Sequence, residues 1–372
     1  MKLLLVEPFF TGSHANWAKE YATHSRHEIQ ILSLPGRHWK WRMHGAAISL
    51  ARQFLTLTDM PDLILATDML DLGVFLGLLR HRISDIPIVL YFHENQLTYP
   101  WSPVDQDPGL NRDRHYAFIN YTSALAADHV CFNSHFHQQA FLEALPGFLQ
   151  AFPDHQEIDL VHSIEQKSQV LPLGLNLKAL DAARSTVPAS KKQAPLILWN
   201  HRWEYDKNPE TFFAILQKLS REGFAFRLAV VGESFGRRPA IFSKAKKDLH
   251  QHIVHWGYME DGETYARLLW EADILPGTAK HDFFGVSVVQ AIYCECYPLL
   301  PHRLAYPSHI PNPLHDQHLY ADDAMLMAQL KQVLRQDKIL PSPMLKKHIK
   351  QYDWSHLVHE YDELWEGICS TH

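Results

Sequence analysis

The sequence predicts an α/β protein built from two doubly wound, Rossmann-like domains. The chain has 372 residues, which exceeds the usual size of a single hydrophobic core, so two domains are expected. Short apolar runs alternate with longer stretches in which apolar residues recur every three or four positions. This is the pattern of parallel strands connected by helices. The alternation is interrupted once, at residues 181–195, and then begins again.

The first domain is expected to cover residues 1–185 and to contain six strands. Each candidate strand is a short apolar run, and helical patterns separate the runs. The six runs are KLLLVEP, EIQILSL, DLILAT, PIVLYFH, HVCFNS and SQVLPLG. Strands that alternate with helices in this way indicate a parallel sheet with helices on both faces.

The second domain is expected to cover residues 195–345 and to repeat the pattern. Residues 181–195 are small and polar and contain proline, as is typical of a linker. The strands predicted after it are PLILWN, FRLAVVGES, IVHWGY, DILPGT and YPLLP, and helices are expected from about Glu210 and over ETYARLLWEA and VSVVQAIYCE. Residues 346–372 form an amphipathic helical tail, which places Trp354, Leu357, Tyr361 and Leu364 on one face.

The composition describes an ordinary globular protein and excludes several classes of function. Hydrophobic residues make up 46% of the chain and charged residues 20%. The formal net charge of −6 argues against a generally basic nucleic-acid-binding protein, although a local basic patch stays open. The four cysteines form no CxxC pair, so neither a disulfide framework nor a zinc knuckle is expected.

No segment has the pattern of a targeting or membrane-spanning element. The first apolar run ends at Glu7 and Pro8, which predicts a strand and is too short for a signal peptide. No run approaches the roughly 20 apolar residues of a membrane span. We therefore expect a cytoplasmic protein.

Two Rossmann-like domains that face each other place a ligand in the cleft at the carboxyl ends of their strands. The residues directly after the strands are therefore the candidates. Gly12, Ser13 and His14 follow the first strand, and one glycine is too few for a GxGxxG dinucleotide motif. Gly12 and Ser13 could let a helix N-terminus approach an anion, or they could form a plain turn and N-cap.

His93, Glu94 and Asn95 follow the fourth strand. Three adjacent polar groups at a strand end are costly to bury unless they meet a ligand or each other. We favour a role in the site over a satisfied core network. The nearby Asp105-Gln106-Asp107 imitates the acidic triplet that holds a metal in some sugar transferases, but its prolines and glycine favour an exposed turn.

Arg202 and Lys207 lie in the loop HRWEYDKNPE, after the first strand of the second domain. As a pair they could clamp a diphosphate, because arginine offers a planar fork and lysine a point charge. The alternative is a surface ion-pair cluster with Glu204 and Asp206, which would contribute little.

The stretch TAKHDFFG, residues 278–285, follows a strand and opens a helix. Phe284 and Gly285 would expose backbone N–H groups at the helix start, where a phosphate can be held. Asp282 and Gln290 are eight residues apart and could both face the cleft, or they could be an N-cap and an incidental glutamine.

Basic and aromatic residues alternate in the segment Gly36–His44. Aromatic rings that stack beside cations suit a nucleic acid. The alternative is that the arginine and tryptophan stems cover a loop. The residues concerned are Arg37, Trp39, Lys40, Trp41 and Arg42.

Taken together, these residues resemble the family 4 glycosyltransferases, which have the GT-B fold. The resemblance spans both halves of the chain. It matches the family's Arg-x4-Lys pair, its acidic pair with Phe-Gly inside, and the C-terminal helix that crosses back to the N-terminal domain. The matching positions are Arg202 and Lys207, Asp282 and Gln290 around Phe284 and Gly285, and residues 346–372.

Several stretches are similar to one branch of that family, the tRNA-queuosine mannosyltransferases. They are EPFFTGSHANW, LPGRHWKWRMHGAA, YFHENQLTYP, CFNSHF, WNHRWEYDKNPETFF, VVGESF and TAKHDFFGVSVVQAIYCECYPL. The chain departs from the wider family at three positions. Asp282 and Gln290 stand where glutamates are usual, and Glu295 stands where a glycine is usual.

The resemblance implies transfer of mannose from GDP-mannose to queuosine in a tRNA anticodon, with retention of configuration and without a metal. It implies catalytic roles for His93, Glu94, Asn95, Arg202, Lys207 and Asp282. Donor binding would fall to Gly12, Ser13, His14, Gly232, His281, Phe284, Gly285, Val286 and Gln290. We expect tRNA binding by Arg37, Trp39, Lys40, Trp41 and Arg42, extended by Arg80, Arg82, Arg112 and Arg114.

Two other functions stay open at this point. A family 4 transferase could act on a lipid, a polysaccharide or a small molecule. The altered acidic pair, Asp282 and Gln290, would also suit a non-catalytic protein that binds a nucleotide sugar or RNA.

Overall fold

The computed structural model describes residues 1–110, 112–186, 194–234 and 239–371. The chain divides into two compact units. The N-terminal unit comprises Met1–Leu175 together with Trp354–His372, and the C-terminal unit comprises Asn176–Asp353. We expected the divisions near residues 185 and 346, so the first crossing comes earlier in the chain and the second later.

The N-terminal unit is built on a six-stranded sheet with the order β2-β1-β3-β4-β5-β6, in which all pairs are parallel. The strands are β1 (Lys2–Phe10), β2 (Glu28–Pro35), β3 (Leu63–Thr67), β4 (Ile88–Phe92), β5 (His129–Phe132) and β6 (Ser168–Val170). All six predicted strands are therefore confirmed. Strands β3 and β4 are buried along their whole length, as expected when helices cover both faces of a parallel sheet.

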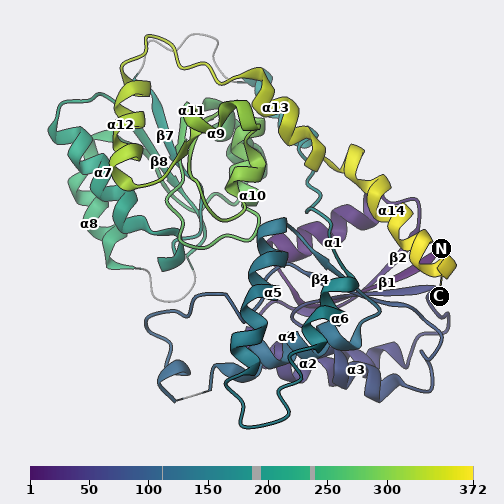
Figure 1. Ribbon diagram of the computed structural model, residues 1–372. Coiled ribbons are helices and arrows are strands. Elements are labelled where there is room, and N and C mark those ends of the chain that lie inside the picture. The colour runs from purple at the N-terminus through teal and green to yellow at the C-terminus, as the bar shows by residue number, and fades with distance from the viewer. Residues whose placement is uncertain (111, 187–193, 235–238, 372) are drawn as a thin grey trace. The chain divides into compact units, whose positions relative to one another are not determined.

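The helices of the N-terminal unit lie on the two faces of its sheet (Figure 1). One face carries α2 (Trp39–Phe54), α3 (Leu72–Leu79), α4 (Arg114–Ala126), α5 (His135–Leu149) and α6 (Leu160–Gln166). The other face carries α1 (Gly12–His24) and α14 (Trp354–Thr371). The predicted linker begins within a short 3-10 helix, η2 (Lys178–Thr186), and its residues 187–193 fall outside the described part of the chain.

The C-terminal unit has a second six-stranded sheet with the order β12-β11-β10-β7-β8-β9. Its strands are β7 (Leu196–Trp199), β8 (Arg227–Val231), β9 (Ile253–Gly257), β10 (Ile274–Pro276), β11 (Tyr297–Pro301) and β12 (Leu319–Tyr320). Five of them were predicted. The two-residue β12 was not, because it is too short to show a periodic pattern.

Helices also lie on both faces of the second sheet (Figure 1). One face carries α7 (Pro209–Arg221), α8 (Ala240–Asp248) and α12 (Asp323–Leu334). The other carries α9 (Gly262–Glu271), α10 (Val286–Tyr293) and α13 (Pro343–Ile349), and α11 (His315–His318) lies beside β11. The remaining 3-10 turns are η1 (Pro108–Leu110), η3 (Tyr205–Lys207), η4 (His250–His252), η5 (Tyr306–His309), η6 (Asn312–Leu314) and η7 (Lys350–Tyr352).

The predicted tail helix is interrupted at η7, so only α14 belongs to the N-terminal unit. Its predicted apolar face is buried at Trp354, Leu357 and Tyr361, whereas Leu364 is half-buried and Trp365 is fully buried. The aromatic rings of Trp354 and Tyr361 on this face pack against Tyr21 of α1. Residues 354–371 thus belong to the same compact unit as α1.

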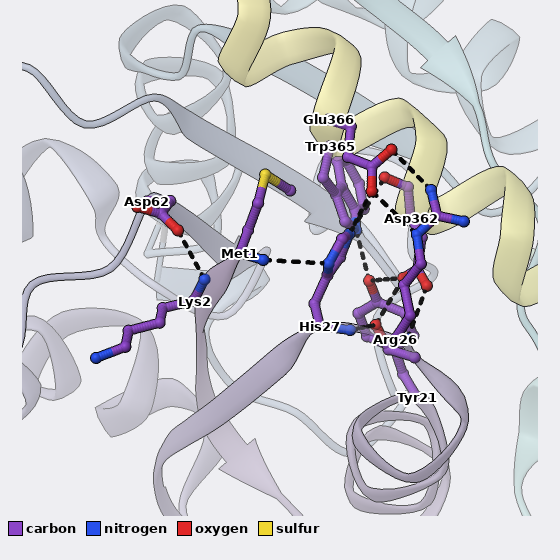
Figure 2. Close-up of polar contacts among 10 residues, drawn as sticks. Met1, Lys2, Tyr21, Arg26, His27, Asp62, Asp362, Trp365 and Glu366 are labelled. Carbon is purple, nitrogen blue, oxygen red and sulfur yellow. Dashed lines mark hydrogen bonds and ion pairs between the residues drawn. The ribbon is translucent and has the colours of Figure 1, made fainter.

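A polar cluster fixes α14 to the start of the chain (Figure 2). The buried carboxylate of Asp362 accepts hydrogen bonds from the Tyr21 hydroxyl at 2.9 Å, the Ser25 hydroxyl at 2.6 Å and the backbone N–H of Arg26 at 3.0 Å. One turn later, the guanidinium of Arg26 binds Glu366 through two nitrogens, at 3.0 and 2.7 Å. Because the buried carboxylate has several donors, its burial cost is offset.

Glu295, at the turn between α10 and β11, adopts a positive φ of 67°. This is the position at which the sequence departs from the glycine usual in the family. A side chain in this backbone region is strained, since only glycine enters it freely. The carboxylate makes ion pairs with Arg184 at 2.9 Å and Lys346 at 3.3 Å.

Among the described residues, no helix combines the length and the apolar character needed to cross a lipid bilayer.

Candidate active site

Lys207 is the centre of a buried charge cluster in the C-terminal unit. Strand β7 ends at Trp199, and the loop after it runs through η3 to the first turn of α7. The Lys207 ammonium lies 3.1 Å from the Asp206 carboxylate and 3.4 Å from the Asp282 carboxylate, and it donates a hydrogen bond to the His281 carbonyl at 2.8 Å. Only 9% of its side chain is exposed.

The cluster brings together two loops that are far apart in sequence. The backbone N–H groups of Lys280 and His281 point to the carbonyl of Asp206, at 2.8 and 3.3 Å. The Thr278 hydroxyl donates to the carbonyls of Lys207 and Asn208, at 3.0 and 3.1 Å. The loop after β7 and the loop after β10 are therefore fixed to each other, which brings the two predicted site residues Lys207 and Asp282 together.

Asp282 is held as a carboxylate by its neighbours. Burial alone would raise the pKa of Asp282, but the positive charge of Lys207 outweighs this effect and lowers it. The Tyr306 hydroxyl also donates to the Asp282 carboxylate, at 3.0 Å. Tyr306 is fully buried and comes from η5, and nothing in its sequence context marks it as a site residue.

Two buried histidines flank this cluster in their neutral form. Burial, together with the nearby charge of Lys207, lowers the pKa of His201 and of His281 to about 4. The Nδ1 of His201 lies 3.1 Å from the Ser287 hydroxyl in the first turn of α10. The His201 Nε2 is buried without a hydrogen-bond partner in the structure. His281 was predicted as a donor-binding residue, whereas His201 was not singled out.

Arg202 is exposed, in contrast to Lys207. Two carboxylates share its surroundings. Burial raises the pKa of both Glu204 and Glu233, and the positive charge of Arg202 opposes that shift in each. The two basic residues thus differ in their surroundings. The guanidinium of Arg202 is exposed and lies near Glu204 and Glu233, whereas the ammonium of Lys207 is buried and contacts Asp206 and Asp282. Lys207 does pair with Asp206, as the alternative of an ion-pair cluster expects, but this pair is buried and does not lie at the surface.

Two glycines allow the backbone to approach closely around this cluster. Gly285 caps the N-terminus of α10 with a φ of 91°, and an added Cβ would lie 3.1 Å from the Tyr306 ring. Gly232, after β8, has a φ of 153°, and a Cβ there would lie 2.0 Å from the carbonyl oxygen of His201. Both positions therefore require glycine. At the start of α10, the half-buried Val286 directly follows Gly285, and the Phe284 carbonyl accepts from His309 Nε2 at 2.5 Å.

Gln290 belongs to a second polar chain on α10. The hydroxyl of Tyr265 lies 3.4 Å from the Gln290 Oε1 and 3.4 Å from the Asn200 Nδ2. The Asn200 Nδ2 also donates to the Ser287 carbonyl at 2.8 Å, while its Oδ1 is buried without a hydrogen-bond partner. Asn200, Tyr265 and Ser287 were not identified from the sequence, because each of them is an ordinary polar residue at a helix or strand boundary.

His93, Glu94 and Asn95 form a partly satisfied network after β4 of the N-terminal unit. The backbone N–H groups of His93 and Glu94 point to one oxygen of Asp68, at 2.7 and 3.5 Å. The Asn95 side-chain oxygen accepts from the backbone N–H of Thr98 at 2.8 Å. The His93 Nε2 and the Asn95 Nδ2 are buried without hydrogen-bond partners. Unpartnered polar atoms are rare in the interior, so they favour the predicted site role.

Glu7 and His14 join His93 at the neighbouring strand end. Glu7 lies within β1 and is completely buried, and its Oε2 is 3.2 Å from the Nδ1 of His14. The ring of His14 packs against the ring of His93 with a centroid distance of 4.3 Å. Glu7 was not identified from the sequence, because a charged residue after an apolar run is expected to end the strand.

His14 and His93 differ in their protonation state. Burial by itself would lower the pKa of His14, but the Glu7 carboxylate, with smaller effects from Asp68 and Glu94, raises it to about 9. Burial and the neighbouring His14 instead lower the pKa of His93 well below its usual value. The pair therefore comprises one imidazolium and one neutral imidazole at pH 7.

Glu7, His14 and His93 are also the group among the described residues whose donor atoms would suit a metal ion, since these atoms lie within 4.8 Å of one another. However, the raised pKa of His14 indicates that its ring carries a proton, so the 3.2 Å contact between Glu7 and His14 is an ion pair. The structure supports an ion pair with a neighbouring neutral ring, and it gives no second carboxylate ligand to this group.

The expected tRNA-binding segment is the start of α2. Trp41 is 63% exposed, whereas Trp39 is half-buried against Trp101 and Tyr116. Lys40 lies 2.8 Å from Asp105 and 2.5 Å from Asp107, so the acidic triplet holds a lysine. The other predicted cations are exposed or half-buried, namely Arg37, Arg42, Arg80, Arg82, Arg112 and Arg114.

The fold and the sequence now define the class of protein. Two of the solved structures that resemble this chain show its fold. Sucrose-phosphate synthase from Thermosynechococcus elongatus matches with a TM-score of 0.72 and 13% identity over 100% of both chains. The Anabaena protein HepE, solved in complex with UDP and glucose, matches with a TM-score of 0.66 and 12% identity over 98% of this chain and 99% of its own. The chain therefore has the GT-B fold.

The family is narrower than the fold. A family model described as the N-terminal part of tRNA-queuosine alpha-mannosyltransferase matches residues 2–175. The tRNA-queuosine alpha-mannosyltransferase of Drosophila melanogaster is 32% identical over 343 residues, which cover 91% of this chain and 88% of the relative. The chain belongs to the tRNA-queuosine alpha-mannosyltransferase family and is a glycosyltransferase. A non-catalytic role is thereby set aside.

Proposed function

We propose that this enzyme transfers mannose from GDP-mannose to queuosine in a tRNA anticodon, in the cytoplasm and with retention of the anomeric configuration. The family match supports the acceptor and the sugar. The observation that carries the chemistry is the burial of Lys207 beside Asp282 at the glycine-capped start of α10. A cation, a carboxylate and free helix N–H groups in one place suit a donor with a diphosphate and a sugar.

The C-terminal unit would hold the donor. Departure of GDP develops negative charge on the diphosphate, which needs a counter-charge when no metal supplies it. In this proposal Arg202, Lys207 and the backbone N–H groups after Gly285 provide that charge, each typically worth about 3–4 kcal/mol in the transition state. Asp282 would accept hydrogen bonds from sugar hydroxyls. Gln290 would bind the ribose without a charge, within its chain of Tyr265 and Asn200.

The N-terminal unit would hold the acceptor. His93 is neutral and keeps Nε2 without a partner, which suits a hydrogen bond to a sugar or to the incoming hydroxyl. Glu94 and Asn95 would position this contact. The departing phosphate would itself take the proton of the acceptor hydroxyl, so no strong protein base is needed. The C1–O bond to GDP breaks while the new C1–O bond forms on the same face of the mannose.

The tRNA would bind through the start of α2. Arg37, Lys40 and Arg42 would contact phosphates, and the exposed Trp41 would stack on a base. Trp39 would stabilise the start of α2 without contacting the RNA, since its ring packs against Trp101 and Tyr116. The exposed Arg80, Arg82, Arg112 and Arg114 would extend the contact along the phosphate backbone.

Mass spectrometry of the tRNA tests the proposal directly. Purified protein is incubated with queuosine-containing tRNA and with a panel of sugar nucleotides in the presence of EDTA. We expect a mass increase of one hexose on queuosine with GDP-mannose, and none with tRNA that lacks queuosine. Transfer from another sugar nucleotide would contradict the donor, and a requirement for added metal would contradict the metal-free mechanism.

The same experiment separates the remaining alternative. A family 4 transferase that modifies a lipid, a polysaccharide or a small molecule would leave the tRNA unchanged and would still turn over its donor when a cell extract supplies the acceptor.

Lys218→Ala, an exposed substitution on α7, serves as the control variant for every change made in the site.

A further inference from the structure

Glu7 has no part in the transfer reaction proposed above, yet its side chain is completely buried. An ionised carboxylate is costly to bury unless its oxygens are satisfied. Here the Oε1 accepts from the backbone N–H of Phe9 at 2.8 Å and the Oε2 contacts the Nδ1 of His14 at 3.2 Å. Because Nδ1 is engaged by Glu7, only the Nε2 of His14 is left for a ligand.

His14 lies in the first turn of α1, a helix of 13 residues. The residue before this helix, Thr11, makes no side-chain capping bond, and the first turn contains no acidic residue. The backbone N–H groups at such a helix start favour an anion. No atom lies within 4 Å of the place where a Cβ of Gly12 would stand, so the helix start is accessible at that residue.

His93 supplies an independent indication of a ligand at this place. Its side chain belongs to a residue with 8% exposure, and its Nε2 has no hydrogen-bond partner. Its ring packs against His14, and one donor atom from each of Glu7, His14 and His93 lies within 4.8 Å of the others. A buried ring nitrogen without a partner, next to a histidine that is already oriented, is the arrangement expected of a binding site for a polar ligand.

We propose that Glu7 is a positioning residue that fixes the His14 ring, so that the start of α1 binds a phosphate group beside His93. The proposal rests on the proposed function, because a nucleotide-sugar donor and a tRNA both bring phosphate groups. Glu7 itself does not touch the ligand. It acts through His14.

The charges around His14 support this assignment. The carboxyl groups that face the ring come from three elements: Glu7 from β1, Asp68 after β3 and Glu94 after β4. Against the effect of burial, they raise the pKa of His14 to about 9, while the adjacent His93 stays neutral.

Binding of GDP and of unmodified tRNA to the full chain, each measured at pH 5.5 and pH 8, tests this role of Glu7. In Glu7→Gln the His14 ring keeps a partner but loses the charge that holds its proton. We compare the affinity of Glu7→Gln with that of the wild type for each ligand. For GDP or for tRNA, we expect the loss of affinity in the variant to be at least fivefold larger at pH 8 than at pH 5.5. His14→Gln should show a loss at both pH values, and His24→Gln, at the exposed end of the same helix, should show none.

Each outcome is decisive. A loss confined to GDP assigns the phosphate to the donor, and a loss confined to tRNA assigns it to the acceptor. An equal loss of affinity at both pH values, or no loss, overturns the role of Glu7. If the wild-type protein binds no GDP at either pH, the proposed donor is contradicted. The measurements with tRNA then decide the role of Glu7. If Glu7→Gln does not fold, Glu7→Asp is measured in the same way; its shorter side chain keeps the charge but withdraws it from His14, so a smaller excess loss at pH 8 is expected. Cobalt(II) absorption bands that disappear in His14→Gln would show a metal site and would also overturn the proposal.

Discussion

The hydroxyl of Tyr21 in α1 donates a 2.9 Å hydrogen bond to the buried carboxylate of Asp362 in α14. Asp362 also accepts from Ser25 and from the backbone of Arg26, so its removal would leave three donors without their partner. We expect Asp362→Ala to lower the free energy of unfolding of the N-terminal unit by roughly 2–4 kcal/mol. Urea denaturation followed by fluorescence measures this change, since Trp17 and Trp365 lie in the same core. The neighbouring exposed Glu363→Ala should have almost no effect, and similar stabilities for the two variants would contradict the argument.

Arg202 and Lys207 should differ in what their loss does to stability. Arg202→Ala removes an exposed guanidinium, so we expect folding to stay nearly intact while mannose transfer falls by a factor of at least 100. Lys207→Ala leaves the buried Asp206 and the partly buried Asp282 without their cation, so we expect the same loss of transfer and, in addition, a destabilisation of about 3 kcal/mol. Single-turnover transfer assays and thermal unfolding measure the two effects. An active Arg202→Ala enzyme would reduce this loop to a structural ion-pair cluster.

Lys40 is held by Asp105 and Asp107, so it should contribute to tRNA binding only after it leaves them. We expect Asp105→Asn/Asp107→Asn to raise the affinity for tRNA by several-fold, because two negative charges leave the binding surface. The combined Lys40→Ala/Arg42→Ala should weaken binding and lower the slope of log K against log salt. Filter binding across a salt series measures both. Unchanged affinity in the second variant would remove this segment from the tRNA surface.

The neutral histidines of the C-terminal unit predict a loss of stability in acid. His201 and His281 have a pKa of about 4 in the folded protein, below the value of about 6.5 that an unfolded chain gives. Their contribution is therefore complete above pH 6.5 and is lost as the pH falls toward 4, because the unfolded chain binds the protons first. Chemical denaturation between pH 4.5 and 7 should show this slope. His281→Asn should flatten it, while the exposed His162→Asn should not.

Much of the fold could be predicted from the sequence, because parallel strands that are buried on both faces are continuous apolar runs. The runs at Leu63–Thr67 and Ile88–Phe92 are examples, and the polar residues Asp68 and His93 directly after them mark the strand ends. The meeting of Lys207 with Asp282 was predicted only as a shared site, from their places after two strands.

The partners of these residues could not be predicted. Tyr306 reaches Asp282 from a short turn, and Asp105 reaches Lys40 from a loop 65 residues away in sequence. Such contacts depend on the tertiary fold and leave no periodic pattern in the chain. Glu7 is a harder case still, because a charged residue within a strand pattern predicts exposure, whereas here a histidine of the next helix covers it.

The order in which the chain is made gives α14 a further consequence. Residues 354–371 leave the ribosome only after the whole of residues 176–353, although they belong to the unit that begins at Met1. Until then, Trp17 and Tyr21 of α1 lack the aromatic side chains that cover them in the finished protein. The N-terminal unit therefore stays incompletely folded, with aromatic side chains exposed, while residues 176–353 are synthesised. We expect chaperones that bind exposed aromatic surface to bind the nascent chain at this stage.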